Sequence, residues 1–224
     1  MGDEHRQAGV TDVASPATGS PADEGGEASQ VLRARREKLQ ALRERGIDPF
    51  AYAFDRSHAA ADAVARFEAA EEEGELEEGG DGATVRVAGR IVSWRGHGRS
   101  AFCHVEDGSG RIQLYFRKDV LGDERFSDLD LLDLGDWIGV EGPLFRTRTG
   151  EVTVRPTSWT LLTKALRPLP LGKVETDPET GERVVHSGFS DQESRYRQRY
   201  ADLAVNADVR EVFRTRSRIV TEMR

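Results

Sequence analysis

Two aromatic rings, an amide and an imidazole occupy alternate positions of two neighbouring segments. Phe102 and His104 are two residues apart in the segment RSAFCHVED, and Gln113 and Tyr115 are two residues apart in the segment RIQLYF. Successive side chains of a strand point to opposite faces. If both segments are paired strands, the four side chains share one face. Rings can stack on unpaired bases, and an amide can read a base edge as donor and acceptor. The pattern therefore predicts a surface for single-stranded nucleic acid.

The opposite positions of both segments are apolar and predict a core face. They are Ala101, Cys103, Val105, Ile112, Leu114 and Phe116. Cys103 is the sole cysteine, so it cannot form an internal disulfide and is expected to be a small core residue. Asp107-Gly108-Ser109-Gly110 between the segments predicts a hairpin turn. An alternative for Phe102 and Tyr115 is packing beneath a loop or beneath residues 119–134.

The two strands belong to a longer run of strand patterns. Five strands are expected between Thr84 and Thr163, with a helix or irregular cover over 118–133 after the third. Gly89 predicts a bulge or bend in the first strand. In the fifth, EVTVRPTSWTLLT, Val152 and Val154 alternate with Glu151, which is therefore expected to point outward beside the aromatic face. Five strands with a helical insertion at this place are typical of the OB-fold, which binds oligonucleotides.

The remaining chain divides by composition. The divisions are 1–28, a disordered tail; 29–82, a helical segment with an acidic linker; 83–165, the barrel; 166–190, a linker with a possible hairpin turning at 177–181; and 191–224, two helices. In the second segment, helix 30–45 is expected to start at a Ser29 cap and to end at Gly46, and a second helix is expected to start at Ser57.

Two of these helices carry candidate binding residues. Helix 30–45 is strongly basic and could hold a phosphate backbone; the alternative is a solvated helix face. Its candidate residues are Arg33, Arg36, Lys38 and Arg43. The last helix, with Asn206 as its expected cap, places apolar residues at helical spacing, and the chain stops inside that pattern, so we expect the front part of a longer protein. Its candidate interface residues are Val209, Val212, Phe213 and Ile219.

Composition excludes several classes of function. The 224 residues carry a net charge of −8, which argues against attraction of the whole molecule to nucleic acid and requires a local basic patch. No apolar run has the length of a membrane span, and the N-terminus lacks a signal core, so a cytoplasmic protein without a membrane partner is expected. His97 and His104 are interpreted as surface residues, and no metal site is expected.

Four stretches together resemble the N-terminal part of a class II lysyl-tRNA synthetase. They are RREKLQALRERGIDPF, VAGRIVSWRGHGRSAFCHVEDGSGRIQLYF, LLTKALRPLP and RYRQRYADLAVNADVREVFRTRSRIV. The resemblance implies a mainly β fold with flanking helices. In it, a five-stranded OB-fold barrel follows N-terminal helices and precedes the start of an α+β catalytic domain. It also implies a lysine–tRNA ligase, which forms lysyl-adenylate from lysine and ATP and transfers the lysyl group to tRNA(Lys).

The resemblance assigns roles to individual residues. It implies that Phe102 and Tyr115 stack on anticodon bases, that Gln113 bonds the central uridine, and that Glu151 and Arg95 complete the anticodon site. Trp94 departs from the family, which often has a basic residue there.

Residues 208–224 resemble the start of motif 1, the dimer-forming helix, so a homodimer is implied for the full-length enzyme. Motifs 2 and 3 are absent, so no catalytic residue is assigned in this chain. ATP and Mg²⁺ would be bound by the part that carries those motifs, and the chain by itself is expected to be inactive.

Three alternatives remain open at this point. The chain could be a free-standing OB-fold protein that binds tRNA or another single strand. It could be the equivalent part of an aspartyl- or asparaginyl-tRNA synthetase, since these enzymes share the barrel pattern. It could also be a non-catalytic subunit that uses helix 208–224 for assembly.

Overall fold

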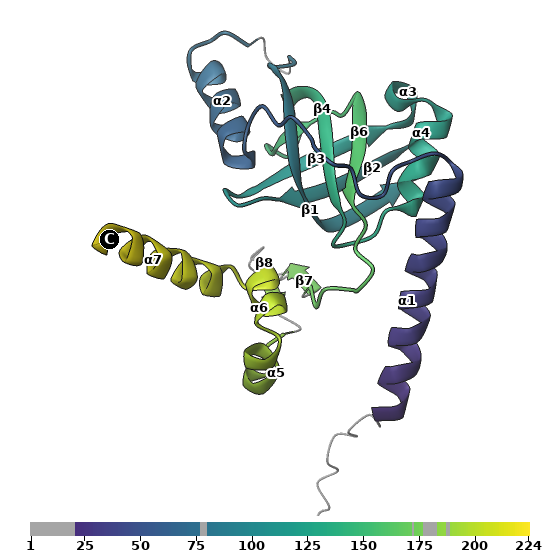
Figure 1. Cartoon of the computed structure of the whole chain (residues 1–224). Coiled ribbons are helices and arrows are strands. Elements are labelled where there is room, and N and C mark those ends of the chain that lie inside the picture. Colours follow the sequence, from purple (N-terminus) through teal and green to yellow (C-terminus); the bar gives the residue numbers. More distant parts are fainter. Residues whose placement is uncertain (1–20, 77–79, 172, 177–182, 187–188) are drawn as a thin grey trace, which may run out of the picture.

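The computed structural model describes residues 21–76, 80–171, 173–176, 183–186 and 189–224. Its centre is a closed barrel whose strands run in the order β1-β2-β3-β5-β4-β6, with β1 also paired to β4 (Figure 1). The strands are β1 (Thr84–His97), β2 (Ser100–Glu106), β3 (Arg111–Arg117), β4 (Trp137–Arg146), β5 (Val152–Val154) and β6 (Ser158–Thr163). This is the OB-fold architecture that the strand pattern predicts.

The barrel closes because β1 is long enough to serve two neighbours. Its first half pairs with β4 and its second half with β2, with the change of partner at Arg90. The register shift expected at Gly89 lies instead between Ile91 and Ser93. Gly89 has a different role: a Cβ there would lie 3.0 Å from the carbonyl oxygen of Glu106, so the close approach of two strands requires glycine.

The predicted fifth strand is two strands in the structure. It breaks after Val154, and Pro156 at the break has no N–H to donate to a ladder. The corner packs tightly, since a Cβ on Gly142 of β4 would lie 2.0 Å from the oxygen of Arg155. β5 pairs in parallel with β3 and antiparallel with β4, which brings its residues beside Gln113.

The predicted inner face of β2 and β3 is confirmed as core. Cys103, Leu114 and Phe116 are fully buried, and Val105 and Ile112 are nearly so. Burial raises the pKa of the Cys103 thiol, so the cysteine is a packed and unreactive core residue. Because the alternation holds through both strands, the opposite positions face out of the barrel.

The N-terminal helix begins earlier than predicted. α1 spans Pro21–Glu44, so residues 21–28 are not a disordered tail and Ser29 is not a cap. Pro21 at the first helical position and the acidic residues Asp23 and Glu24 favour a start at this point. The end agrees with the prediction, because Gly46 has φ 70° and its N–H bonds the oxygen of Arg43.

The second helix, α2 (Ala60–Glu72), is capped by the β2–β3 hairpin instead of by Ser57. The N–H of Ala60 donates to Asp107 Oδ2 (3.0 Å) and the N–H of Ala61 donates to Ser109 Oγ (3.0 Å). Ser57 bonds the β1 backbone, where its Oγ accepts from the N–H of Arg86 (2.8 Å). The predicted turn at residues 107–110 is present, and Asp107 Oδ1 accepts from the N–H of Ser109.

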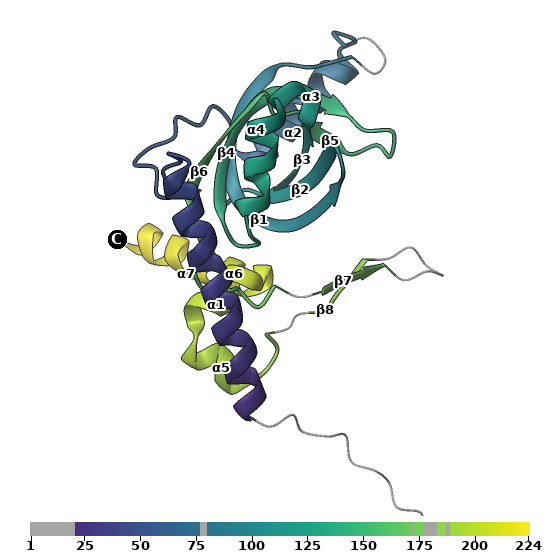
Figure 2. The same cartoon turned by 90° about the vertical axis from the view of Figure 1, so that its right-hand side faces the viewer.

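Short helices cover the barrel between β3 and β4, as expected for 118–133. They are α3 (Lys118–Leu121), α4 (Asp123–Ser127) and the 3₁₀ helix η1 (Asp128–Leu131) (Figure 2). The end of α1 is fixed against this cover, with Leu42 fully buried and Arg45 bonded to Asp128 (2.7 Å).

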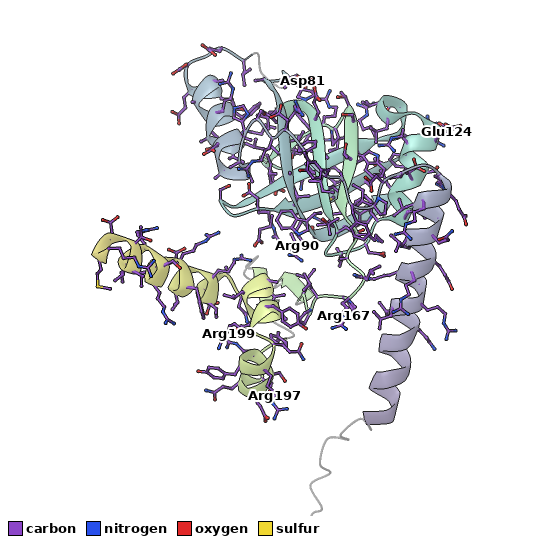
Figure 3. The ribbon with its side chains drawn as sticks, viewed as in Figure 1. Asp81, Arg90, Glu124, Arg167, Arg197 and Arg199 are labelled. Atoms are coloured by element: carbon purple, nitrogen blue, oxygen red, sulfur yellow. The ribbon has the colours of Figure 1, made fainter. Side chains whose placement is uncertain are left out.

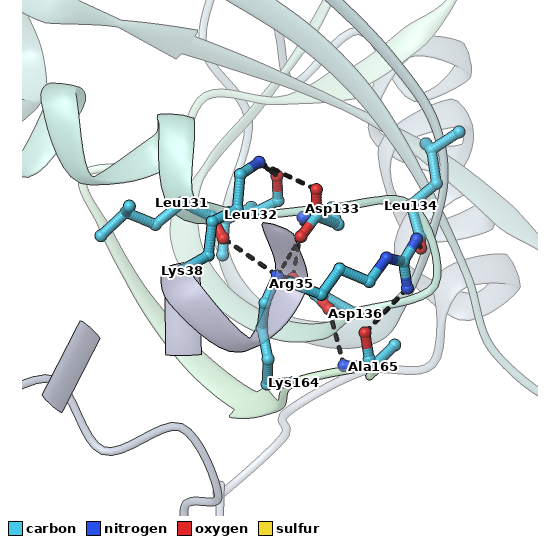
Figure 4. A network of polar contacts seen from close by, with 9 residues as sticks. All are labelled: Arg35, Lys38, Leu131, Leu132, Asp133, Leu134, Asp136, Lys164 and Ala165. Atoms are coloured by element: carbon cyan, nitrogen blue, oxygen red, sulfur yellow. Dashed lines mark hydrogen bonds and ion pairs between the residues drawn. The ribbon is translucent and has the colours of Figure 1, made fainter. Parts of the chain in front are cut away.

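A buried cluster of charges joins α1, the segment before β4 and the exit of β6 (Figure 4). Lys164 Nζ donates to Asp136 Oδ2 (2.7 Å), and both side chains are 0% exposed. Asp133 also bonds Lys164 and, at 2.8 Å, Lys38 of α1. Burial opposes ionisation of Asp133, but the bonds from Lys164 and Lys38 outweigh burial and lower its pKa.

Beyond the barrel the described residues form a hairpin and three helices. The hairpin pairs β7 (Lys173–Thr176) with β8 (Arg183–His186), as predicted, while its expected turn lies outside the described residues. The helices are α5 (Gln192–Arg197), α6 (Arg199–Val205) and α7 (Ala207–Met223). Asn206 precedes α7 but does not cap it with its side chain, which donates instead to Asp202 Oδ1 (2.6 Å).

Replacement of Lys164 by methionine is expected to lower the free energy of unfolding by about 3–5 kcal/mol, because Asp136 stays buried without its cation. Urea unfolding followed by circular dichroism measures the change. Lys38→Met is the matched control: Lys38 contacts the same cluster but keeps 33% of its side chain exposed, so a loss under about 1 kcal/mol is expected. Equal losses in the two variants would contradict the central position of Lys164.

Candidate nucleic-acid interface

A cleft of about 620 Å³ opens on the outer face of β2 and β3. All five residues proposed for base contact line it: Arg95, Phe102, Gln113, Tyr115 and Glu151. They come from four segments, namely β1, β2, β3 and the turn before β5. Strand alternation brings the outward side chains together, and the parallel β3–β5 pairing adds Glu151.

The rings of Phe102 and Tyr115 form one wall of the cleft. The two residues are direct partners in the β2–β3 ladder, and their rings stack with centroids 4.3 Å apart and planes 18° apart. Both side chains are half-buried, so part of the ring surface stays open to the cleft. Such a surface can take up a base by stacking without sequence preference.

A chain of hydrogen bonds forms the floor of the cleft. Gln113 Nε2 donates to Glu151 Oε2 (2.7 Å), and Thr153 Oγ1 donates to Gln113 Oε1 (2.9 Å). These bonds fix which way the amide points. Gln113 is only 5% exposed, whereas Glu151 keeps 37% of its side chain in solvent, so the carboxylate is the more accessible acceptor.

His104 extends this chain, and its interpretation as a surface residue is wrong. The imidazole is 3% exposed and lies behind the cleft, with Nδ1 2.7 Å from Ser93 Oγ and Nε2 2.8 Å from Glu151 Oε1. It points outward from the barrel, as alternation predicts, but Glu151 and its neighbours cover it. The identity of the covering residue depends on the β3–β5 pairing, which a strand pattern does not show.

Sequence reasoning missed the second wall of the cleft. Phe145 of β4 lies tilted against Tyr115 with ring centroids 6.1 Å apart, and Arg155 lies 4.7 Å above the Phe145 ring. The turn after β4 adds Thr147, Arg148 and Thr149. The alternation of β4 gives a signal for Phe145, since it follows the buried Leu144.

Trp94 and Arg95, which are neighbours in β1, lie in different environments. Arg95 is exposed and pairs with Phe102 in the ladder, so its guanidinium is placed at the edge of the cleft. Trp94 points the other way and stacks on Phe116 of the core, with ring centroids 5.8 Å apart. A basic side chain at position 94 would therefore meet the core, and Arg95 is the β1 cation that lines the cleft.

The basic residues of α1 divide into two groups. Arg33, Arg36 and Arg43 are exposed. Lys38 instead bonds Asp133, and Arg35 is buried with bonds to the oxygens of Ala165 (2.7 Å) and Leu134 (2.9 Å) (Figure 4). The helix therefore uses some cations for attachment to the barrel and leaves others at the surface.

Arginines of α5 and α6 also serve attachment within the chain. Asp202 is fully buried and accepts bonds from Arg195 (2.9 Å) and Arg199. Burial acts against ionisation of Asp202, and hydrogen bonds from Asn206 and Arg195 outweigh it, so its pKa is lowered. Figure 3 shows Arg197 and Arg199 on this segment, apart from the barrel.

The apolar side of α7 is uncovered in the described chain. Val212 is 66% exposed and Ile219 54%, Phe213 is also exposed, and Val209 is half-buried. The other side of α7 makes polar contacts. Arg210 bonds Glu106, and Arg214 Nη2 donates to the oxygen of Gly108 (2.6 Å). These bonds hold the start of α7 beside the β2–β3 hairpin.

Two further features bear on the class of function. Within the described ranges, no group of three or more His, Cys, Asp and Glu side chains could hold a metal ion. Among the helices of the same residues, none is long and apolar enough to span a bilayer.

The family model described as an OB-fold nucleic acid binding domain matches residues 85–162, which are the barrel. Curated lysine–tRNA ligases match most of the chain. The enzyme of Bacillus cereus (strain G9842) is 45% identical over 199 residues, and that of Bacillus cytotoxicus is 44% identical over 198. Each match covers 88% of this chain but 36% of the relative. The chain is therefore similar to the lysine–tRNA ligases over about a third of their length, and its barrel matches the OB-fold nucleic acid binding domain family.

Proposed function

We propose that this chain is the tRNA-recognition part of a lysine–tRNA ligase and that its barrel binds the anticodon loop of tRNA(Lys). The observation that carries the proposal is the meeting of Arg95, Phe102, Gln113, Tyr115 and Glu151 in one cleft. Stacking rings, a fixed amide and an accessible carboxylate together suit an unpaired base.

The floor of the cleft favours uracil over cytosine. An ionised carboxylate only accepts hydrogen bonds. The N3–H of uracil can donate to Glu151, whereas N3 of cytosine is an acceptor and would face the carboxylate lone pairs. A site that hydrogen-bonds its ligand discriminates strongly against an analogue with the wrong pattern, because buried polar groups then lose their partners.

The activity of the whole enzyme is part of the same proposal. Lysine, ATP and Mg²⁺ would be used in forming lysyl-adenylate. Among the described residues no group of three or more His, Cys, Asp and Glu side chains could hold a metal ion, and we assign no catalytic residue and no step of that reaction to them. The chain itself would position tRNA by its loop.

The exposed arginines of α1 are proposed to hold the phosphate backbone next to that loop. The chain is acidic overall, so attraction to RNA must come from local cations. Arg33, Arg36 and Arg43 are exposed for this role, whereas Lys38 is engaged by Asp133.

The apolar face of α7 is proposed to pack against a second copy of the chain. Val212, Phe213 and Ile219 give this face an exposed apolar surface along the helix. An uncovered apolar stripe of this kind marks an interaction surface.

Phe102→Ala is expected to weaken binding of a UUU anticodon stem-loop by about 1–3 kcal/mol, because one ring of the stack is lost. Fluorescence anisotropy with the full chain at fixed salt measures the affinity. Tyr52→Ala is the matched control, since Tyr52 is a fully exposed aromatic (104%) that does not line the cleft. Unchanged binding by Phe102→Ala, or an equal loss in the control, would argue against the stacking role.

Joint replacement of Arg33, Arg36 and Arg43 by alanine is expected to weaken binding of a tRNA(Lys) transcript regardless of its anticodon. Each lost phosphate contact should reduce the slope of log affinity against log salt by about 0.7–0.9. Titrations at several salt concentrations measure the slope.

The control for this variant removes the same number of charges from α7 and its C-cap, namely Arg216, Arg218 and Arg224. A slope that changes equally in both triple variants would show that net charge, not the surface of α1, controls binding.

Val212→Asp is expected to shift the chain from dimer to monomer at micromolar concentration, because a charge replaces an exposed apolar contact. Sedimentation velocity measures the state. Arg218→Asp, on the opposite side of α7, introduces the same side chain outside the stripe and should leave the dimer intact. A wild-type chain that sediments as a monomer at every concentration would contradict this interface.

A further inference from the structure

His104 lies where it can act on the cleft without touching a ligand. It is 3% exposed and does not line the cleft, yet its Nε2 lies 2.8 Å from the carboxylate that does. Its other nitrogen, Nδ1, lies 2.7 Å from Ser93 Oγ on the neighbouring strand. The imidazole thus spans the distance between the β1 ladder and Glu151.

The partners determine how the hydrogens are arranged. An ionised carboxylate accepts only, so the short contact to Glu151 requires a hydrogen on Nε2. In a neutral imidazole, Nδ1 then accepts from the hydroxyl of Ser93. Gln113 Nε2 donates to the other carboxylate oxygen at 2.7 Å and lies 3.4 Å from His104 Nε2. Two donors therefore converge on the buried side of Glu151.

This arrangement sets the direction of the carboxylate. Glu151 comes from the turn before β5, where its backbone is held by Thr147, whose Oγ1 accepts from the N–H of Glu151 (3.0 Å). A free glutamate side chain would populate several rotamers and lose entropy when a base binds. Because His104 and Gln113 each bond one carboxylate oxygen from the buried side, the remaining lone pairs face the cleft before any base binds.

We propose that His104 is a positioning residue for base discrimination: through Nε2 it holds Glu151 as a preorganised acceptor for a base that carries an N3–H. This inference rests on the proposed function and adds a residue to it. Ser93 acts behind His104 by fixing the tautomer. Stacking by Phe102 and Tyr115 provides affinity for any base, whereas the Ser93–His104–Glu151 chain provides the choice between bases.

The test compares the affinities of the full chain for a UUU stem-loop and for the same loop with cytosine at the central position. His104→Leu removes the donor in a side chain of similar bulk. The preference for uracil should fall at least about tenfold, the size expected for loss of a hydrogen bond to a charged group, mainly through weaker UUU binding. His104→Gln places an amide N–H near the position of Nε2 and should retain the preference within about threefold.

Three controls separate positioning from other effects. Phe102→Ala should weaken binding of both loops and leave the ratio of the two affinities unchanged. Thermal unfolding reports whether each variant remains folded. Ser93→Ala, which leaves the imidazole in place but removes the partner of Nδ1, should lower the ratio about threefold. If His104→Leu does not fold, the affinity ratios of Ser93→Ala and His104→Gln test the inference in its place.

Folded His104→Leu that discriminates as well as wild type would overturn the inference while leaving the proposed function standing. The inference would also be overturned if Ser93→Ala kept the wild-type preference for uracil while His104→Gln lost it. A donor at position 104 would then not be sufficient for the choice between the two bases. Wild-type chain that binds neither loop would overturn the proposed function and the inference together.

Discussion

The antiparallel pairing of β2 with β3 in one register is the constraint on which the site depends. In this register Phe102 lies opposite Tyr115, and His104 lies opposite Gln113. A slip of one residue would turn these side chains into the core and bring Cys103 and Leu114 to the surface. The buried face opposes that slip, because Cys103, Leu114 and Phe116 are completely buried in the interior. The same apolar packing that stabilises the barrel therefore holds its polar and aromatic face outward.

The hairpin that joins these two strands also organises the neighbouring elements. Asp107 and Ser109 supply the acceptors for the first N–H groups of α2, and Glu106 and Gly108 bond arginines of α7. Burial raises the pKa of Asp107, but hydrogen bonds from Ser109 and from backbone N–H groups outweigh it, so the net shift is downward and Asp107 stays ionised. One tight turn thus connects the outer face of β2 and β3 to α2, which precedes the barrel, and to α7, which follows it.

The features that follow from local sequence were predictable, and those that depend on partners distant in sequence were not. Alternation placed Phe102, Gln113 and Tyr115 outside and Cys103 inside, and the composition of residues 107–110 predicted their turn. The cap of α2 comes from Asp107 instead of the nearby Ser57, because a folded neighbour offers better-placed acceptors. The burial of His104 depends on Glu151, 47 residues away in sequence, which becomes its neighbour only when β5 joins β3. The early start of α1 shows that a good cap residue such as Ser29 can lie inside a helix when a better start precedes it.

The most direct test of the account replaces the central anticodon uridine by 4-thiouridine, irradiates its complex with the full chain, and locates the cross-links by mass spectrometry. If the outer face of β2, β3 and the turn before β5 reads the loop, the cross-links should fall on peptides that contain Phe102, Tyr115 or Glu151. Cross-links confined to α1 or α7, from a complex that binds with undiminished affinity, would contradict the claim that this face of the barrel receives the bases.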